Sequence, residues 1–291
     1  MKTAKLAKSY RIDDGKHFRL KDFDPAGTAH WNSVDEAKDQ LQKDIARMEE
    51  LQAMLYAQGR WSLLLIFQAM DAAGKDGTIK HVMSGVNPEG CQVHSFKAPS
   101  PTELQHDFLW RTTEALPERG HIGIFNRSYY EEVLVVRVHP KVLEGQLVPP
   151  QLIGKDIWKE RFEDIHSFER HMARNGTVIR KFFLNLSKKE QKKRFLARLD
   201  EPEKHWKFSE ADIHEREYWD DYQDAYEDMI RHTASKHAPW YVVPADNKWF
   251  THLVVAAAIV ETLEELGLSY PKVDAAKLKE IAAARRTLSR K

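Results

Sequence analysis

The chain has 291 residues, of which 42% are hydrophobic and 31% are charged, and its formal net charge is +1. This length suits a single α/β domain with elaborations or two small domains. The near-zero net charge means that no global field marks a nucleic-acid or membrane binder, so a polyanionic substrate would have to meet a local basic patch. The single cysteine, Cys91, excludes an internal disulfide and fits a reducing cytosol, so we expect a cytoplasmic protein.

Two parts of the sequence bear on targeting, and we expect neither a signal peptide nor a membrane span from them. Its first ten residues lack the apolar core of a signal peptide, and the longest apolar run outside the strands, Leu253 to Val260, is too short to span a bilayer. Residues 1–60 are expected to form an arm followed by an amphipathic helix. That helix begins at the capping box Ser33-Val-Asp-Glu36 and ends at Gly59.

A buried strand followed by a glycine–lysine loop dominates the chain. The apolar run from Leu63 to Phe67 predicts a parallel strand, and a helical pattern opens at Thr78. This layout is typical of a phosphate-binding loop, in which backbone N–H groups and a lysine face an anion. The expected phosphate contacts are Ala72, Ala73, Gly74, Lys75, Asp76, Gly77, Thr78 and Lys80.

The strict phosphate-loop pattern is nevertheless missed twice. Ala69 stands where the first glycine belongs, and Asp76 stands where a serine or threonine would hold magnesium, so an ordinary strand-to-helix turn is the alternative. Carboxylates beside phosphates need a divalent cation between them, and Mg²⁺ binds through one or two carboxylates plus substrate phosphates. We therefore expect Mg²⁺ to be held by Asp71.

A second polar segment follows the strand predicted over His121 to Phe125. Asn126 and Arg127 stand at its carboxyl end, where open α/β sheets bind ligands. Asn126 could coordinate a metal through its carbonyl, and Arg127 could clamp phosphate oxygens, although a surface salt bridge is the alternative. Glu131 either faces back toward this cleft or belongs to a solvated helix face.

The remaining chain continues to alternate strands and helices. Further strands are expected over Gln92–Phe96, Thr177–Leu186 and Trp240–Val243. Further helices are expected from about Thr102 to Gly120, over Ile157–Met172, Asp212–Thr233 and Asn247–Leu266, and in the tail, residues 271–291. This order predicts a mostly parallel five-stranded sheet covered on both faces. A basic helix from Lys188 to Arg198 is either a solvated face or part of a lid over phosphates, which we place at residues 187–215.

Several motifs resemble those of the polyphosphate kinase type 2 family. They are Phe67-Gln-Ala-Met-Asp-Ala-Ala-Gly-Lys-Asp-Gly77, Ser95-Phe-Lys-Ala-Pro-Ser100, Arg127-Ser-Tyr-Tyr-Glu131, Trp206-Lys-Phe-Ser209, Glu215-Arg-Glu-Tyr-Trp-Asp-Asp-Tyr222, Ala238-Pro-Trp-Tyr241 and Lys248-Trp-Phe250. The resemblance covers residues 12–270 or so, and the Tyr130-Glu131 variant is similar to the class III branch, which phosphorylates both AMP and ADP.

The resemblance implies a single three-layer α/β/α P-loop kinase domain like thymidylate kinase, with a helical lid, Mg²⁺, and assembly into homodimers or homotetramers. It implies transfer from inorganic polyphosphate to AMP or ADP, with Asp71 on the metal and Arg127 on the nucleotide phosphate. Further implied contacts are Lys181, Arg194, Arg198 and Lys207 for polyphosphate or the lid, and Asn87, Lys97, Glu131 and Arg137 for the nucleotide.

One position departs from the family pattern. Where the family has an aspartate that helps to bind metal, this chain has Asn126, which has the same shape and one charge fewer. The chain is then either an engineered low-activity variant or a natural asparagine enzyme with weaker metal binding. Two rival functions stay open: an ATP-dependent nucleoside or nucleotide kinase of the same fold, and a decayed P-loop binding protein.

Overall fold

The computed structural model describes residues 3–289, and the side chains of these except residues 3–5 and 207. Its centre is a six-stranded sheet in the order β1-β6-β5-β2-β4-β3. The strands are β1 (Arg11–Ile12), β2 (Ser62–Gln68), β3 (Cys91–Ser95), β4 (Ile122–Asn126), β5 (Thr177–Asn185) and β6 (Trp240–Pro244). All neighbours pair in parallel except β1, which pairs antiparallel with β6.

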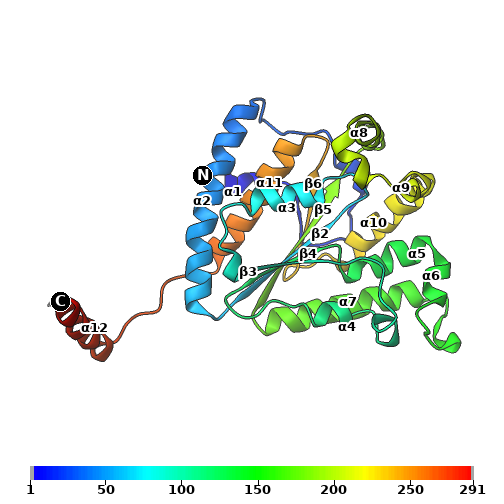
Figure 1. Cartoon of the computed structure of the whole chain (residues 1–291). Helices are drawn as coiled ribbons and strands as arrows, with labels where there is room; N and C mark the ends of the chain where they lie inside the picture. The colour runs from blue at the N-terminus through cyan, green and yellow to red at the C-terminus, as the bar shows by residue number, and fades with distance from the viewer. Residues whose placement is uncertain (1–2, 290–291) are drawn as a thin grey trace.

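Helices cover both faces of this sheet, which gives the three layers visible in Figure 1. The α-helices are α1 (Thr3–Lys8), α2 (Val34–Gln58), α3 (Lys75–Val82), α4 (Trp110–Thr113), α5 (Val135–Val138), α6 (Pro140–Glu144), α7 (Ile157–Arg174), α8 (Lys188–Asp200), α9 (Glu210–Glu215), α10 (Trp219–Thr233), α11 (Lys248–Glu265) and α12 (Ala275–Leu288). Short 3-10 turns are η1 (Leu20–Asp22), η2 (Pro88–Gly90), η3 (Glu103–Gln105), η4 (Tyr129–Val133), η5 (Pro150–Leu152), η6 (Pro202–Lys207) and η7 (Arg216–Tyr218).

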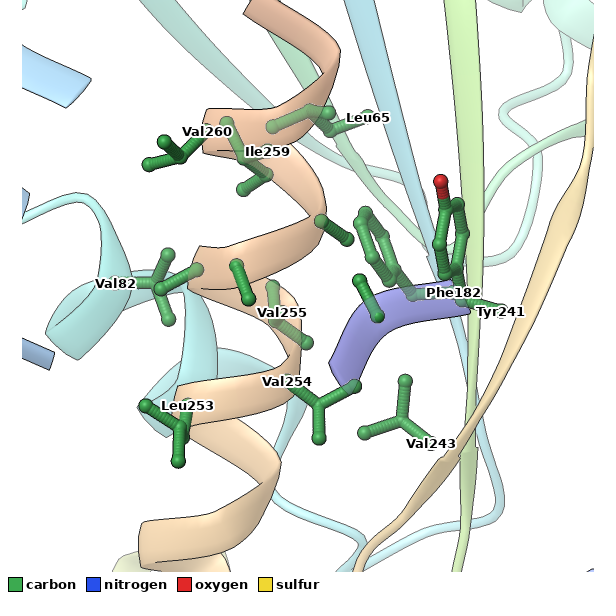
Figure 2. Packing of buried hydrophobic residues seen from close by; sticks show 14 of the residues in the cluster. Leu65, Val82, Phe182, Tyr241, Val243, Leu253, Val254, Val255, Ile259 and Val260 are labelled. Atoms are coloured by element: carbon green, nitrogen blue, oxygen red, sulfur yellow. The ribbon is translucent and has the colours of Figure 1, made fainter. Parts of the chain in front are cut away.

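One face of the sheet is covered by α1, α2, α3 and α11, and α11 has more buried apolar side chains than α2. Figure 2 shows Val254, Val255 and Ile259 of this helix turned toward Phe182 and Tyr241 of the sheet, and all five side chains are buried. Burying one such aliphatic side chain contributes roughly 1.5–3 kcal/mol. Because α2 covers the outer side of α11, the helix is apolar around most of its circumference and shows little sequence periodicity.

The helix predicted after the N-terminal arm is confirmed with both of its ends. The Ser33 hydroxyl accepts the Glu36 N–H, and Gly59 ends α2 in the left-handed conformation with a φ of 58°. A glycine adopts this conformation without the steric cost that a Cβ atom would bring. The capping residues therefore place α2, which packs against α11 through its periodic apolar side chains.

Four predictions of local structure need correction. The sheet has six strands rather than five, because two residues of the arm, too few for any periodicity, pair with β6. The helix expected from Thr78 begins at Lys75, since Gly74 already provides its left-handed N-cap. The single helix expected after Thr102 is a 3-10 turn followed by α4, and the long helix expected over Asp212–Thr233 is divided by η7.

The C-terminal tail forms α12, which stands apart from the sheet at the end of an extended segment (Figure 1). Its described residues are exposed. Among residues 3–289, no helix has both the length and the apolar character needed to cross a bilayer. Residues 290–291 of the predicted tail and residues 1–2 of the predicted arm lie outside the described part of the chain.

Candidate active site

The loop after β2 adopts a strained backbone conformation. β2 is buried along its whole length, and the Thr78 N–H closes the first turn of α3 on the Gly74 carbonyl at 2.9 Å. Ala72 has a φ of 63° and Gly74 a φ of 100°, both in the left-handed region. Holding a non-glycine residue there costs roughly 1–3 kcal/mol, and such strain concentrates at ligand sites. The predicted phosphate contacts 72–78 thus form this loop and the first turn of α3, whereas Lys80 is exposed further along the helix.

Lys75 is the first residue of α3, and its Nζ donates to the Ala69 carbonyl at 3.0 Å. Burial lowers the pKa of Lys75, and the nearby carboxylate of Asp71 opposes this shift. Only one of the three ammonium hydrogens has a hydrogen-bond partner in the described part of the chain. The lysine therefore keeps donors for an anion at the positive N-terminus of the helix.

The end of β4 brings the second polar segment beside this loop. Asn126 is paired in register with Phe67 of β2, and the Arg127 N–H donates to the Phe67 carbonyl at 3.0 Å. The Asn126 amide donates to the Asp76 carboxylate, with 2.7 Å between Nδ2 and Oδ1. The parallel register therefore places the two polar segments side by side at one edge of the sheet.

Arg127 lies between two carboxylates. Its guanidinium donates to Asp71 at 3.0 Å and lies 3.9 Å from Glu131, and all three side chains are 27–39% exposed. Burial lowers the pKa of Arg127, but Glu131 and Asp71 outweigh that effect and raise the pKa overall. Burial raises the pKa of the Glu131 carboxyl, while the positive charges of Arg127 and Lys75 oppose this shift. Glu131 therefore faces the cleft and is not on a solvated helix face.

An apolar cavity of about 720 Å³ opens beside Arg127 and Glu131. Its lining includes the aromatic rings of Phe96, Phe108 and Tyr129, and it also includes Lys97 and Arg111 at one side. A cavity of this size, which combines apolar walls with several charged side chains, is typical of a site for a small organic ligand.

Two expected polyphosphate contacts serve the protein itself. Arg194 is nearly buried, and its guanidinium donates to the carbonyl groups of Ala72, Ala73, Ala245 and Asp246 at 2.7–3.1 Å. It therefore ties the phosphate loop to the loop before α11 and has little capacity left for a polyanion. The periodicity of the basic helix could not reveal this, because the acceptors are backbone carbonyl groups far away in sequence.

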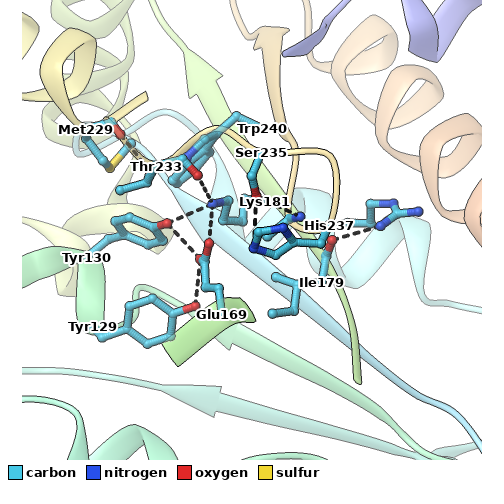
Figure 3. A network of polar contacts seen from close by, with 12 residues as sticks. Tyr129, Tyr130, Glu169, Ile179, Lys181, Met229, Thr233, Ser235, His237 and Trp240 are labelled. Carbon is cyan, nitrogen blue, oxygen red and sulfur yellow. Dashed lines mark hydrogen bonds and ion pairs between the residues drawn. The ribbon is translucent and has the colours of Figure 1, made fainter. Parts of the chain in front are cut away.

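The position of Lys181 contradicts the sequence prediction more directly. Its side chain is fully buried in the core (Figure 3). Its three ammonium hydrogens have three acceptors: Glu169 at 2.7 Å, the Tyr130 hydroxyl at 2.8 Å and the Thr233 carbonyl at 2.9 Å. A lysine with every donor used and no exposure cannot reach a bound polyphosphate. The expected contact of Lys181 with polyphosphate is therefore wrong.

The remaining predicted residues are scattered. Arg198 lies near the site, where it pairs with Asp212 at 3.2 Å, and Arg137 pairs with Asp228 at 2.7 Å. Lys97 is exposed at the mouth of the cavity. Asn87 precedes β3 and therefore lies at the opposite edge of the sheet from the loop. Lys207 lies in η6, and its side chain is outside the described part of the chain.

Sequence reasoning missed two residues that lie near the site. The Gln191 amide donates to the Asp71 carbonyl at 3.0 Å, so α8 supports the loop at a second point. Burial raises the pKa of Asp212, and the negative charge of Asp71 adds to the shift, which places Asp212 within electrostatic reach of the loop. The only signal for either residue was its position in the basic segment and the helix after it.

No group of three or more His, Cys, Asp or Glu side chains within the described residues is arranged to hold a metal. Mg²⁺ does not require one, since it takes one or two carboxylates and completes its shell with substrate phosphates and water. Asp71 and Asp76 are carboxylates at the mouth of the loop, and Asn126 adds a carbonyl oxygen. These hard oxygen donors fit Mg²⁺.

Comparison with known proteins gives one consistent result. The family model for polyphosphate kinase 2 (PPK2) matches residues 31–269. The chain is 54% identical over 282 residues to an ADP-polyphosphate phosphotransferase of Rhodopseudomonas palustris, which covers 97% of this chain and 98% of that one. It is 46% identical over 270 residues to an AMP/ADP-polyphosphate phosphotransferase of Meiothermus ruber, with 92% and 97% covered.

A solved structure agrees. The crystal structure of polyphosphate kinase 2 from Arthrobacter aurescens superposes with a TM-score of 0.87 at 40% identity and covers 96% of each chain. The sheet order, the glycine–lysine loop and the helical layers are therefore those of a P-loop kinase fold, as the motifs predict. On the family model and these relatives, the chain belongs to the polyphosphate kinase 2 family.

Proposed function

We propose that this chain carries out the polyphosphate-dependent nucleotide phosphotransfer of its family at the edge of the sheet where β2 and β4 end. The observation that carries the proposal is the convergence of Lys75, Asp71 and Arg127 beside one apolar cavity. Lys75 and the N-terminus of α3 would hold the terminal phosphates of the donor. Arg127 would hold the phosphate of the acceptor nucleotide, AMP or ADP.

The cavity supplies the place for the acceptor nucleoside. Its aromatic lining suits a flat base, and Arg127 stands where the lining meets the phosphate loop. A nucleotide seated in this way would present a phosphate oxygen to the donor phosphate held by Lys75. Such an oxygen is already an adequate nucleophile, so the protein needs only to orient the two groups and stabilise the developing charge.

Asp71, Asp76 and residue 126 would hold Mg²⁺. When bound, this ion would offset the negative charge of the reacting phosphates. The Asn126 amide donates to Asp76, and Arg127 donates to Asp71. An aspartate at position 126 would face Asp76 across the same 2.7 Å, a distance that two carboxylates tolerate only with a cation or proton between them.

With Asn126, no cation is needed beside Asp76, because the amide donates a hydrogen bond to this carboxylate. The site also has one negative charge fewer than it would have with an aspartate. This contact supports the interpretation of the chain as a low-activity variant of an aspartate enzyme. A natural enzyme that works with the asparagine would have to bind metal through Asp71 and Asp76 alone. We favour the variant, because the amide uses the carboxylate oxygen of Asp76 that a metal would need.

The segment from residue 187 to 215 would act as a lid. Its helices α8 and α9 face each other through the Arg198–Asp212 pair, and its lysines Lys189, Lys192 and Lys193 are exposed. Arg198 is the charge of this segment that could exchange Asp212 for a phosphate. Closing over the substrates would exclude water from the transfer.

The test of this function is incubation with ADP and polyphosphate in the absence of ATP, followed by measurement of new ATP. The proposal predicts ATP in this mixture, and more of it from the Asn126→Asp protein. Activity that requires ATP as donor would favour the rival kinase of the same fold. If the aspartate protein also forms no product, the chain is instead a decayed binding protein. Size-exclusion measurements would test the expected dimer or tetramer.

A further inference from the structure

The segment that carries Arg127 is anchored in the core by charges that no step of the transfer uses. Two and three residues beyond Arg127, the hydroxyl groups of Tyr129 and Tyr130 both donate to one carboxylate oxygen of Glu169, at 2.9 and 2.7 Å. The other oxygen of Glu169 accepts from Lys181 at 2.7 Å. We call these four residues the buried network, and Figure 3 shows them meeting between β5, α7 and η4.

The hydrogen-bonding groups of the buried network are paired, and its two charged side chains are not exposed to solvent. Glu169 and Lys181 are both fully buried, and Lys181 uses its remaining donors on the Tyr130 hydroxyl and the Thr233 carbonyl. The Lys181 ammonium also lies 5.2 Å from the centre of the Tyr130 ring and 5.0 Å from that of Trp240. Two desolvated charges rarely add stability in comparison with apolar residues of similar size. A buried ion pair of this kind therefore invites the question of which segment it holds in position.

The buried network lies next to the backbone of Arg127 and can hold it in position. This residue has a φ of 63°, which an arginine does not adopt freely. Its side chain must nevertheless point at Asp71, and Glu131, on the other side of the tyrosines, must point back at Arg127. The Ser128 hydroxyl accepts the Tyr130 N–H at 3.2 Å, which tightens the same turn. Anchors at Tyr129 and Tyr130 therefore lie between the two active-site residues.

We infer that Glu169 and Lys181 are positioning residues, which hold Arg127 and Glu131 in place through the hydroxyl groups of Tyr129 and Tyr130. The inference rests on the proposed role of Arg127 toward the nucleotide phosphate. It makes the ion pair in the core part of the phosphotransfer machinery, although neither residue touches a substrate.

The test separates position from stability. The double substitution Lys181→Met/Glu169→Leu removes both charges together, so it leaves no unpaired ion and should lower the melting temperature less than either single substitution. The pair Tyr129→Phe/Tyr130→Phe removes only the two hydroxyl anchors. In both variants we expect kcat/KM for the nucleotide to fall about ten- to a hundredfold, the scale of a misplaced contact group, while the KM for polyphosphate stays unchanged.

Arg180 provides a matched control. It precedes Lys181 on β5 and points to the other face of the sheet, where it is nearly buried and pairs with Thr262 at 2.8 Å and Glu265 at 3.3 Å. Arg180→Met removes a buried cation of the same strand without touching the Arg127 segment. This variant should keep the nucleotide kinetics of the parent. All measurements use the faster of the Asn126 and Asn126→Asp proteins as the parent.

A double-mutant cycle with Arg127→Ala decides the outcome. If the network acts through Arg127, the network substitutions should cause no further loss in the Arg127→Ala background. An Arg127→Ala protein as active as the parent would overturn the proposed role of Arg127, and the inference with it. A slow Arg127→Ala protein beside folded network variants of full activity would overturn this inference alone. Equal losses in both backgrounds would also overturn it, because the network would then act elsewhere.

Discussion

Two regions of the molecule place cations beside carboxylates, and they do so in opposite ways. At the end of β2 and β4, Arg127 meets Asp71 with both side chains about one-third exposed, and Lys75 has one hydrogen bond to a backbone carbonyl. Between the sheet and α7, Lys181 meets Glu169 with neither side chain exposed and every ammonium hydrogen used. Spare donors at a solvent-facing edge indicate a site for a ligand, whereas a saturated buried pair indicates support for the fold around it.

The comparison also separates two arginines of the basic helix. Arg194 resembles Lys181, because its donors are used on backbone carbonyl groups of two loops. Arg198 resembles Arg127, because it is partly exposed and holds one carboxylate that a phosphate could replace. Position in a basic run therefore says less about function than the number of donors that the fold leaves over.

The largest effect should come from Lys75. Removing its charge with Lys75→Met keeps the length of the side chain, and we expect transfer to be abolished because no other side chain at the head of α3 can replace the ammonium. Burial lowers the pKa of Lys75, so the folded protein already disfavours the charge and the melting temperature should not fall. The measurement compares the transfer rate of Lys75→Met with that of the protein that keeps Lys75, both with aspartate at position 126. Similar rates would remove the phosphate loop from the mechanism.

The second prediction concerns Asn126→Asp. Losing one charge-assisted contact that forms in the transition state costs roughly 3–4 kcal/mol, so the aspartate should raise turnover about two to three decades. Nucleotide affinity should change little. Without Mg²⁺, the new carboxylate at position 126 would face Asp76 where the amide of Asn126 donates a hydrogen bond, and the two charges would repel each other. Mg²⁺ should therefore raise the melting temperature of this variant more than that of the parent.

The matched comparison for that prediction is Asp76→Asn/Asn126→Asp, which exchanges the two groups and keeps their hydrogen bond. It should show the weak Mg²⁺ response of the parent. An Asn126→Asp protein that is no faster, and whose melting temperature ignores Mg²⁺, would show that residue 126 is not part of a metal site.

The two arginines of α8 supply the third prediction. At low salt, Arg198→Gln should raise several-fold the polyphosphate concentration that gives half the maximal rate. This corresponds to the loss of a partly screened charge contact that contributes on the order of 1 kcal/mol. At high salt, this concentration should differ less between Arg198→Gln and the parent. Arg194→Gln should lower the melting temperature and turnover at every salt concentration, because the bonds it loses are nearly buried. Identical salt responses of the two variants would contradict the distinction between them.

Much of the fold and part of the site follow from the sequence, and the reason is the range of the interactions. Ser33 and Gly59 act on neighbours in the chain, so the ends of α2 could be predicted. The apolar run of β2 and the glycine–lysine step placed the loop in the same way. Asn126 and Arg127 could be placed beside the loop because carboxyl ends of adjacent parallel strands meet.

The errors come from contacts between distant segments. Lys181 has the same charge as the other candidate lysines, and only the packing of α7 on β5 brings Glu169 to it. Asn87 is polar and follows the helix of the phosphate loop, yet it precedes β3 and so lies at the opposite edge of the sheet. No pattern in the sequence around either residue distinguishes these environments from the active site.

The last prediction tests the remaining case, a buried carboxylate that forms no ion pair within residues 3–289. Asp44 on α2 is 5% exposed, with Gln40 donating to one oxygen at 2.9 Å and no hydrogen-bond partner for the other in the described chain. Burial raises its pKa to about 6 from 3.8, and the Gln40 bond opposes the shift. The folded state therefore holds this proton more tightly than the unfolded state, so stability from this group is lost as pH rises from about 4 to 6.

Asp44→Asn keeps the bond from Gln40 and carries no charge, so it should be more stable than the parent above pH 6 by on the order of 2–3 kcal/mol. The advantage should vanish near pH 4, where the parent carboxyl is protonated when folded. Denaturant unfolding across this pH range provides the measurement, with the exposed Asp39→Asn of the same helix as control. If the stability curves of Asp44→Asn and the parent ran parallel, Asp44 would have to be paired with a cation or a water, and it would then belong with Glu169.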